Sequence, residues 1–381
     1  YDAILVNLPE PASVQLNRYY SREFFALVSR RLAPGGIFSF ALPGGETGLN
    51  PQRAAFLALT YHTLREIFPV VLVLPGEKVR FVAGFTPQAL SADPDELSRR
   101  LAQRGPSLRY VRDYYLQADL APERREYVER LLASSSPGSN RDLQPQSVLY
   151  DMALRGAREG LPLGRLLFFL HHLPSWWLWL LAGAAALSLQ ACRRPGSQAL
   201  MQITVMGMGT MALEIMVLIL CQTHLGYLYR QLGLLVAAFM AGMGAGAVLG
   251  LRLCRGSPHP GRWLAACQGT LALLALLLVL GLKGLAAWPQ PPAFLLHLGY
   301  FLILFPAGAA GGAIFSLATF RWRTHSPASP LRAGLAYAAD LLGATLGSLV
   351  LGFLGLPIWG FLPLLLALAV LHTAAALNAW R

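Results

Sequence analysis

Apolar runs and amphipathic stretches alternate along the first third of the chain. A short, wholly apolar run predicts a buried strand, and apolar residues at every third or fourth position predict a helix. The pattern predicts, in order, a strand at Tyr1–Asn7 with its apolar core at Ala3–Val6, a helix at Tyr19–Ala33, a strand at Ile37–Leu42, a helix at Pro51–Phe68, and strands at Val70–Leu74 and Val79–Phe85. This β-α-β-α-β-β order is typical of the second half of a doubly wound, Rossmann-like α/β sheet.

The first predicted strand ends at Asn7 and runs into a proline-rich turn. Because the strand is apolar throughout, we expect it to be a central parallel strand, with its end beside Ala41 at the end of the second strand. Ligands bind at this carboxyl edge of an open α/β sheet, so Asn7 lies where chemistry is expected. The chain also starts inside this element and without Met, so we expect part of the domain to precede it.

Further along the chain the pattern becomes polar and then strongly apolar. Residues 92–133 favour polar helices, and residues 134–165 favour a linker because Ala133–Gln146 is rich in turn-forming residues. Beyond residue 166 the apolar stretches reach about 20 residues, the length that spans a bilayer. We count seven of them, at about residues 173–192, 200–222, 231–251, 263–283, 294–319, 332–354 and 358–378.

These boundaries predict three parts. Residues 1–133 form the C-terminal part of an α/β domain, residues 134–165 a linker, and residues 166–381 an all-α, polytopic membrane domain of about seven helices. The lipid bilayer is therefore the first partner that the sequence predicts.

Composition supports a membrane protein. The mean hydropathy is +0.48, and 55% of the residues are apolar whereas 13% are charged. The net charge is +12, but residues 166–381 hold 11 basic and two acidic residues, and the basic ones border the apolar stretches. Such borders are typical of membrane spans, so we expect no nucleic-acid partner. The four cysteines have no spacing that suits a metal, so we expect no metal site.

Two acidic residues, Glu214 and Asp340, lie within the apolar stretches. A charge at mid-bilayer costs about 2.5–3.5 kcal/mol, so we expect the Glu214 side chain to point into the helix bundle. Each residue is either a packed, hydrogen-bonded group or part of a polar membrane site for an ion or substrate. Glycines that recur at every fourth residue within 242–250, 308–312 and 343–347 predict close helix packing.

Several motifs of the first part follow one another in a familiar order. They are YDAILVNLPEP at residues 1–11, YYSREFF at 19–25 and LAPGG at 32–36. This set resembles the polyamine aminopropyltransferase (spermidine synthase) family. Three later segments look like the membrane-fused branch of that family: LREIFPVVLVLPGEKVRFVAGF (64–85), NRDLQP (140–145) and YAADLLGATLG (337–347).

The resemblance implies transfer of an aminopropyl group from decarboxylated S-adenosylmethionine to a polyamine. It implies that Asn7 and Glu10 match the family's catalytic acids and that Tyr19 and Tyr20 bind substrate. An amide can orient the attacking amine but cannot accept its proton, so catalysis is weakened or lost unless Glu10 replaces the missing acid. The half that binds decarboxylated S-adenosylmethionine is expected upstream, so we expect this chain alone not to bind that substrate tightly.

Two alternatives are open at this point. The chain could be a polytopic transporter or scaffold whose first part is a degenerate transferase domain, with Asn7 and Glu10 serving only the turn around two prolines. It could also be another cofactor-dependent transferase, such as a methyltransferase, because the cofactor-binding half is not in the sequence.

The basic residues near the predicted spans give a conflicting signal about sidedness. Five lie on the side of the first domain and nine on the opposite side. Cytoplasmic loops carry such an excess, so seven spans would place the first domain outside the cell, where a cytosolic nucleotide cofactor is absent. We expect a multi-pass protein of the bacterial inner membrane with a cytoplasmic first domain, because a large folded domain can outweigh a modest charge bias.

Overall fold

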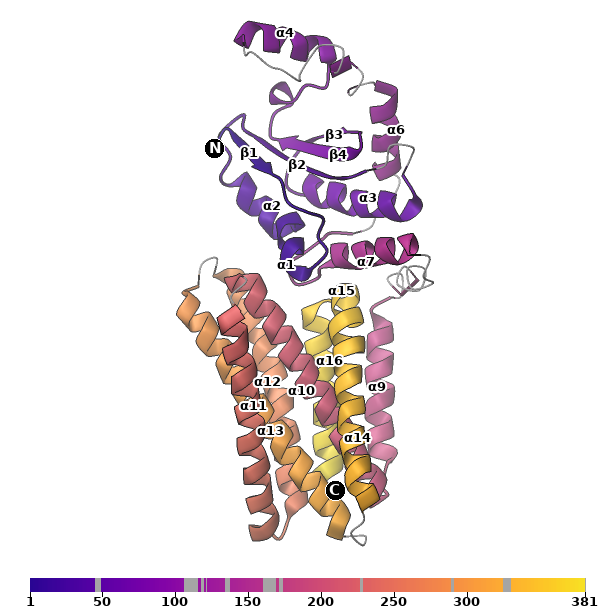
Figure 1. The fold of residues 1–381 in the computed structure, drawn as a ribbon, viewed down its shortest axis with the longest axis vertical. Helices are drawn as coiled ribbons and strands as arrows, with labels where there is room; N and C mark the ends of the chain where they lie inside the picture. Colours follow the sequence, from indigo (N-terminus) through magenta and orange to yellow (C-terminus); the bar gives the residue numbers. More distant parts are fainter. Residues whose placement is uncertain are drawn as a thin grey trace. The chain divides into compact units, whose positions relative to one another are not determined.

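The computed structural model describes residues 1–44, 49–105, 116–117, 120, 122–133, 138–159, 169–170, 174–226, 229–288, 291–324 and 330–380. The chain divides into two compact units, Tyr1–His172 and Leu173–Arg381. Within the residues described, the first unit combines a small sheet with helices, and the second consists of helices (Figure 1).

The first unit follows the predicted element order. Its elements are β1 (Ala3–Val6), α1 (Val14–Asn17), the 3-10 turn η1 (Arg18–Tyr20), α2 (Arg22–Ser29), β2 (Ile37–Pro43), α3 (Pro51–Arg65), β3 (Val70–Leu74), β4 (Lys78–Gly84), the 3-10 turn η2 (Pro87–Ala89), α4 (Pro94–Arg104), α6 (Pro122–Ala133) and α7 (Gln146–Arg158). The β-α-β-α-β-β pattern read from the sequence is therefore present.

The four strands form one mixed sheet in the order β1-β2-β4-β3. β1 and β2 are parallel and Val6 pairs with Phe40, so Asn7 lies beside Ala41 as predicted, but β2 continues to Pro43 and the sheet is mixed rather than parallel. β3 and β4 form the predicted hairpin at one edge of the sheet. The prediction that β1 is central is wrong, because β1 forms the other edge and Leu5 is 74% exposed.

The LAPGG motif sets the approach of β1 to β2. Gly35 has a φ of +80°, a conformation that favours glycine. A Cβ atom on Gly36 would lie 2.9 Å from the backbone oxygen of Tyr1. The Ala33 N–H donates to that same oxygen at 2.8 Å. The two glycines therefore let the chain turn after α2 and start β2 directly beside β1.

Aromatic side chains form the core between the sheet and its helices. Phe25 of α2 packs on Phe38 and Phe40 of β2, with ring centroids 5.7 Å apart in both cases. Phe40 also stacks on Phe81 of β4 at 5.2 Å. These rings are almost fully buried, and α2 and α3 run along the sheet (Figure 1).

The segment after α6 is folded onto this unit, contrary to the predicted linker at 134–165. Asn140 is 1% exposed; its backbone N–H donates to Thr63 Oγ1 at 2.9 Å, and its side-chain Nδ2 donates to the Tyr20 carbonyl, also at 2.9 Å. The following helix α7 packs on α3. Turn residues predict a linker, but contacts with distant positions bury Asn140 and most of the residues between 147 and 156; residues 134–137 and 160–165 lie outside the described residues.

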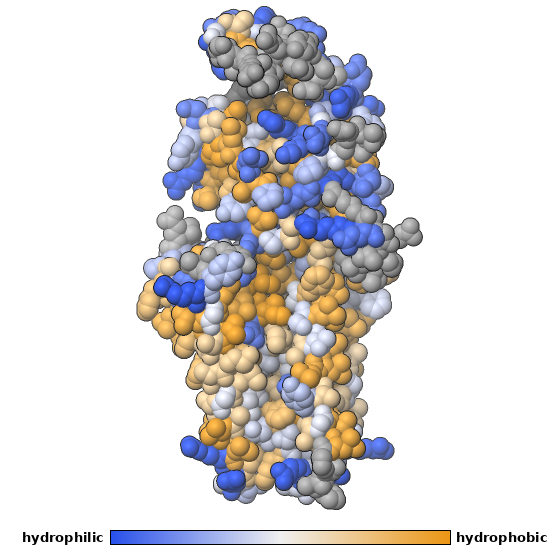
Figure 2. Space-filling view, in the orientation of Figure 1, coloured by the Kyte–Doolittle hydropathy of each residue, from blue (hydrophilic) through white to orange (hydrophobic). Residues whose placement is uncertain are grey.

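The second unit is a bundle of long helices. They are α9 (Trp176–Ala191), α10 (Pro195–Leu225), α11 (Tyr229–Gly256), α12 (Pro260–Ala287), α13 (Ala293–Thr324), α14 (Pro330–Leu346), which continues through the π-helical segment η3 (Gly347–Gly355) into α15 (Leu356–Trp359), and α16 (Phe361–Trp380). Figure 2 shows apolar residues along the sides of this unit and hydrophilic residues at the end where the C-terminus lies.

Within the described residues, six helical segments are long and apolar enough to cross a membrane, one fewer than predicted. The predicted first span instead forms α9, an apolar helix of 16 residues. At 1.5 Å per residue α9 is about 24 Å long, shorter than the roughly 30 Å hydrocarbon core. Six such segments indicate a multi-pass membrane protein.

The predicted glycine contacts hold α11 and α13 together. A Cβ atom on Gly246 would lie 1.9 Å from the Ala309 carbonyl oxygen, and one on Gly308 would lie 2.2 Å from that of Phe239. The glycines are therefore required for the backbones to approach this closely. Pro306 lies inside α13 without ending it.

Candidate functional site

The loop after β1 carries the first predicted site. Asn7 is exposed at the end of the strand. Glu10 forms an ion pair with Arg53 of α3, with Oε1 3.0 Å from Nη1, and the two side chains are 17% and 5% exposed. The carboxylate is thus held close to the strand end, but its charge is balanced by a nearly buried guanidinium.

Arg53 is a residue that the sequence analysis missed. It lies in the first turn of α3, where Asn50 caps the helix by accepting the Arg53 N–H at 2.7 Å. Its guanidinium also lies 5.8 Å from the centroid of the Phe56 ring. The Asn50-Pro51 cap signal predicts the helix start, but only the folded chain brings this turn to the Glu10 loop.

The two tyrosines of the YYSREFF motif have different environments. Tyr20 is 1% exposed, and its hydroxyl donates to the carbonyl oxygens of Leu8 and Pro9 at 3.2 and 3.0 Å. Burial, followed by the charge of Glu10, raises the pKa of Tyr20 to about 12, so the hydroxyl keeps its proton. Tyr19 is 42% exposed and packs edge-on against Phe24. Tyr20 therefore holds the loop, whereas Tyr19 is accessible to a ligand.

The predicted membrane residues Glu214 and Asp340 do not form one compact site. Glu214 on α10 is 6% exposed, which confirms that its side chain points into the bundle. Asp340 on α14 is half-buried against Gly207, since a Cβ atom there would lie 2.7 Å from Asp340 Oδ1. Asp340 lies beside Gly207 of α10, and Glu214 lies seven residues further along that helix, or about 10 Å away.

A second group of polar side chains, which the sequence analysis missed, links α10, α12 and α16. His372 Nδ1 lies 2.7 Å from Gln268 Oε1, and Gln268 Nε2 donates to Gln202 Oε1 at 2.8 Å. Gln202 Nε2 donates to Asn378 Oδ1 at 3.1 Å, and Asn378 Nδ2 donates to the Leu189 carbonyl at 2.7 Å. We call these four side chains, with Gln198, the amide network.

The direction of the amide network assigns the His372 tautomer. Gln268 Nε2 also lies 3.3 Å from the Gln202 backbone carbonyl, so the oxygen of Gln268 must face His372. His372 therefore donates from Nδ1, and its Nε2 is buried without a hydrogen-bond partner among the described residues. A Cβ atom on Gly209 would lie 1.8 Å from that Nε2, so no ligand fits there. The network is a packing device between helices.

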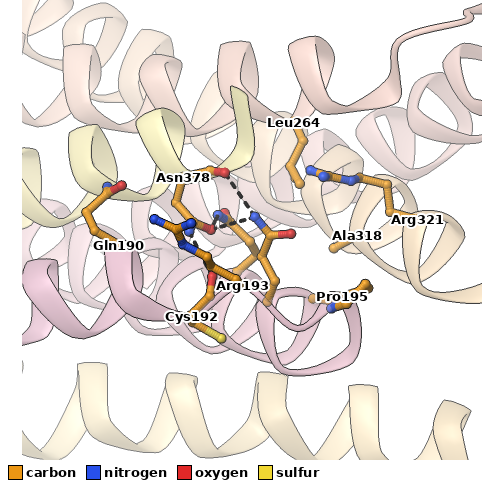
Figure 3. A pocket seen from close by; sticks show the side chains of 11 residues that line it. Gln190, Cys192, Arg193, Pro195, Leu264, Ala318, Arg321 and Asn378 are labelled. Carbon is orange, nitrogen blue, oxygen red and sulfur yellow. Dashed lines mark hydrogen bonds between the residues drawn. The ribbon is translucent and has the colours of Figure 1, made fainter. Parts of the chain in front are cut away.

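The amide network borders a polar cavity of about 540 Å³ (Figure 3). Arg321 of α13 donates to the Ala379 carbonyl at 3.0 Å, and Figure 3 shows its side chain extending toward Asn378. Arg193, in the connection from α9 to α10, lines the cavity from another side. No carboxylate occurs among its described lining residues, whose polar members are Gln190, Arg193, Gln198, Gln202, Arg321 and Asn378. Two guanidinium groups with surrounding amides favour an anion.

The sequence contains a pattern that could have predicted polar residues at this cavity. Gln198 and Gln202 are four residues apart on one helix face, and both lie near a span end where Arg193 and Arg194 follow the preceding helix. An uncharged amide in an apolar stretch is a weaker sequence signal than an acid, although its polar atoms also need hydrogen-bond partners in lipid. The hydrogen-bond partners of Gln198 and Gln202 lie on α12 and α16, which local patterns cannot identify.

Comparisons with known proteins leave the family unassigned. No protein-family model matches the chain, and a search of the curated proteins finds no match either.

Proposed function

We propose that this chain is a multi-pass protein of the bacterial inner membrane whose first unit is a degenerate aminopropyltransferase-like, Rossmann-related domain, and whose function is that of a membrane transporter or scaffold. One observation carries this proposal: Arg53 neutralises Glu10 in a mostly buried ion pair. An amine that attacks a sulfonium carbon must lose a proton, and a carboxylate already paired with a guanidinium is a poor acceptor. Asn7 cannot accept that proton either.

Polyamine binding is disfavoured at this loop for a related reason. A cationic amine is attracted by an uncompensated carboxylate, but the Glu10–Arg53 pair has no net charge. The hydroxyl of Tyr20 is occupied by the loop backbone. Glu10 and Tyr20, two of the residues that carry the resemblance, thus stabilise the loop after β1.

The second candidate is the transferase itself: a membrane-bound spermidine synthase-like enzyme. Its support is the parallel pairing that places Asn7, just after β1, beside Ala41 near the end of β2, together with the exposure of Asn7. In that case Asn7 would orient the amine of a polyamine, Glu10 would accept its proton, and Tyr19 would contact the substrate. The C–S bond of decarboxylated S-adenosylmethionine would break as the new C–N bond forms, leaving a neutral thioether.

A turnover assay separates the two candidates. The protein as its gene encodes it, in isolated membranes, is supplied with decarboxylated S-adenosylmethionine and putrescine or spermidine, and the thioether product is measured. We expect no product above that of Asn7→Ala membranes. Turnover that disappears in both Asn7→Ala and Glu10→Gln, with Tyr127→Phe on exposed α6 as the control variant, would establish the transferase instead.

A further inference from the structure

We propose that the helical unit binds one anionic phospholipid, with the headgroup phosphate in the polar cavity and an acyl chain in an apolar cavity beside it. The polar cavity supplies Arg193 and Arg321 and no carboxylate among its described lining residues. The inference concerns the second unit alone and does not depend on the function of the first.

The apolar cavity lies between α9, α12 and α16 and has a volume of about 750 Å³. Side chains such as Leu187, Leu276, Leu366 and Val370 line it. Gln190 lines both cavities, so they adjoin at this residue. A charged compartment next to an apolar one matches a molecule with a phosphate head and a hydrocarbon tail, whereas a free inorganic anion would leave the apolar cavity unused.

Gln190 has a fixed orientation at the place where the two cavities adjoin. Its Nε2 donates to the Ala374 carbonyl at 2.7 Å, which sets the orientation of the amide. Its Oε1 is buried and has no partner among the described residues.

The position of the cavities along the bundle agrees with this ligand. Trp380 lines the apolar cavity, is 64% exposed, and lies under the guanidinium of Arg262 with 5.5 Å between that group and the ring centroid. Tryptophan and arginine at a helix end mark the depth of lipid headgroups. Basic pockets between membrane helices on the cytoplasmic side are suited to anionic headgroups.

The test measures lipid binding to the purified full chain by native mass spectrometry in detergent. The probes are dioleoylphosphatidylglycerol, dioleoylphosphatidylcholine and inorganic phosphate. We expect one phosphatidylglycerol to bind about tenfold more tightly than phosphatidylcholine, and Arg193→Gln to weaken it about tenfold, as the loss of a charge-assisted hydrogen bond predicts. Arg194→Gln removes the same charge one residue away, outside the cavity lining, and should change binding less than twofold.

A second pair of variants tests the acyl-chain site. Val370 in the apolar cavity is 44% exposed, and Val248 on α11 is 51% exposed, so tryptophan can be introduced at either without repacking the core. Val370→Trp should weaken phosphatidylglycerol binding, whereas Val248→Trp should not. Equal effects of Arg193→Gln and Arg194→Gln, or equal binding of the two lipids, would overturn the proposal. Displacement of the lipid by millimolar inorganic phosphate would assign the cavity to a free anion.

Discussion

At the scale of single residues, Asp142 carries the most direct prediction. Its backbone N–H donates to Glu23 Oε2 at 3.1 Å, so two carboxyl groups lie close together. Burial, and then the charge of Glu23, raises the pKa of Asp142 to about 6, although Ser21 and Arg18 lower it. The folded state therefore binds more protons than the unfolded state between about pH 4 and pH 6, and its stability falls as pH rises through this range.

Asp142→Asn should remove this pH dependence. Two pKa units correspond to at most about 2.7 kcal/mol, so we expect the variant to be more stable than the wild type at pH 7 by about 1–2 kcal/mol and equally stable near pH 4. Pulse proteolysis in urea, followed on fragments of the first unit within the full chain, measures the difference. Glu126→Gln, at an exposed position of α6, is the control. A stability gain that is the same at both pH values would refute the role of the Asp142 charge.

At the scale of elements, the α11–α13 contact depends on individual glycines. Gly246 faces α13, whereas Gly244 on the same helix has no atom within 4 Å of a Cβ position. Gly246→Ala should destabilise the bundle by about 1–3 kcal/mol, because the new methyl group overlaps the Ala309 carbonyl. Gly244→Ala should be neutral or slightly stabilising, since alanine favours a helix.

Thermal unfolding in detergent, followed by tryptophan fluorescence, checks this pair of variants. All eight tryptophans lie in the second unit, so the signal reports on the helices. Similar unfolding temperatures for the two variants would show that the close approach of α11 and α13 contributes little to stability.

At the scale of the whole molecule, the direction of α9 determines on which side of the membrane the first unit is expected. The first predicted span forms the short helix α9, which by its length alone is not among the six membrane-length segments. α9 nevertheless runs in the same direction as α16, because Trp179 and Leu366 line the apolar cavity together and Gln190 reaches the Ala374 carbonyl. The start of α9 and the end of α16 are thus at opposite ends of the bundle.

This arrangement predicts an extracytoplasmic first unit and a cytoplasmic arginine-rich end. In a chain whose native cysteines are replaced, a membrane-impermeant thiol reagent applied to intact cells should label Glu126→Cys but not Ser257→Cys. Inside-out vesicles should give the reverse pattern. Labelling of Ser257→Cys in intact cells would instead show that the first unit is cytoplasmic, where it has access to a cytosolic nucleotide.

The sequence by itself determined the order of the elements, the change from an α/β unit to apolar helices, and the place of Asn7 beside Ala41. These features depend on local periodicity, on turn residues such as Gly35, and on spans that must be apolar over their whole length. Burial of Glu214 also followed from the sequence, because a carboxylate in lipid has few alternatives.

Only the tertiary structure decided how the polar side chains are used. Arg53 reaches Glu10 from 43 residues away and Gln190 reaches the Ala374 carbonyl from 184, so neither partner lies within a local window. The same holds for Asn140, which joins an apparent linker to α3 through Thr63. Hydrogen bonds and ion pairs act over about 3 Å in space whatever the separation in sequence, and so the chemistry of both candidate sites became visible only in the folded chain.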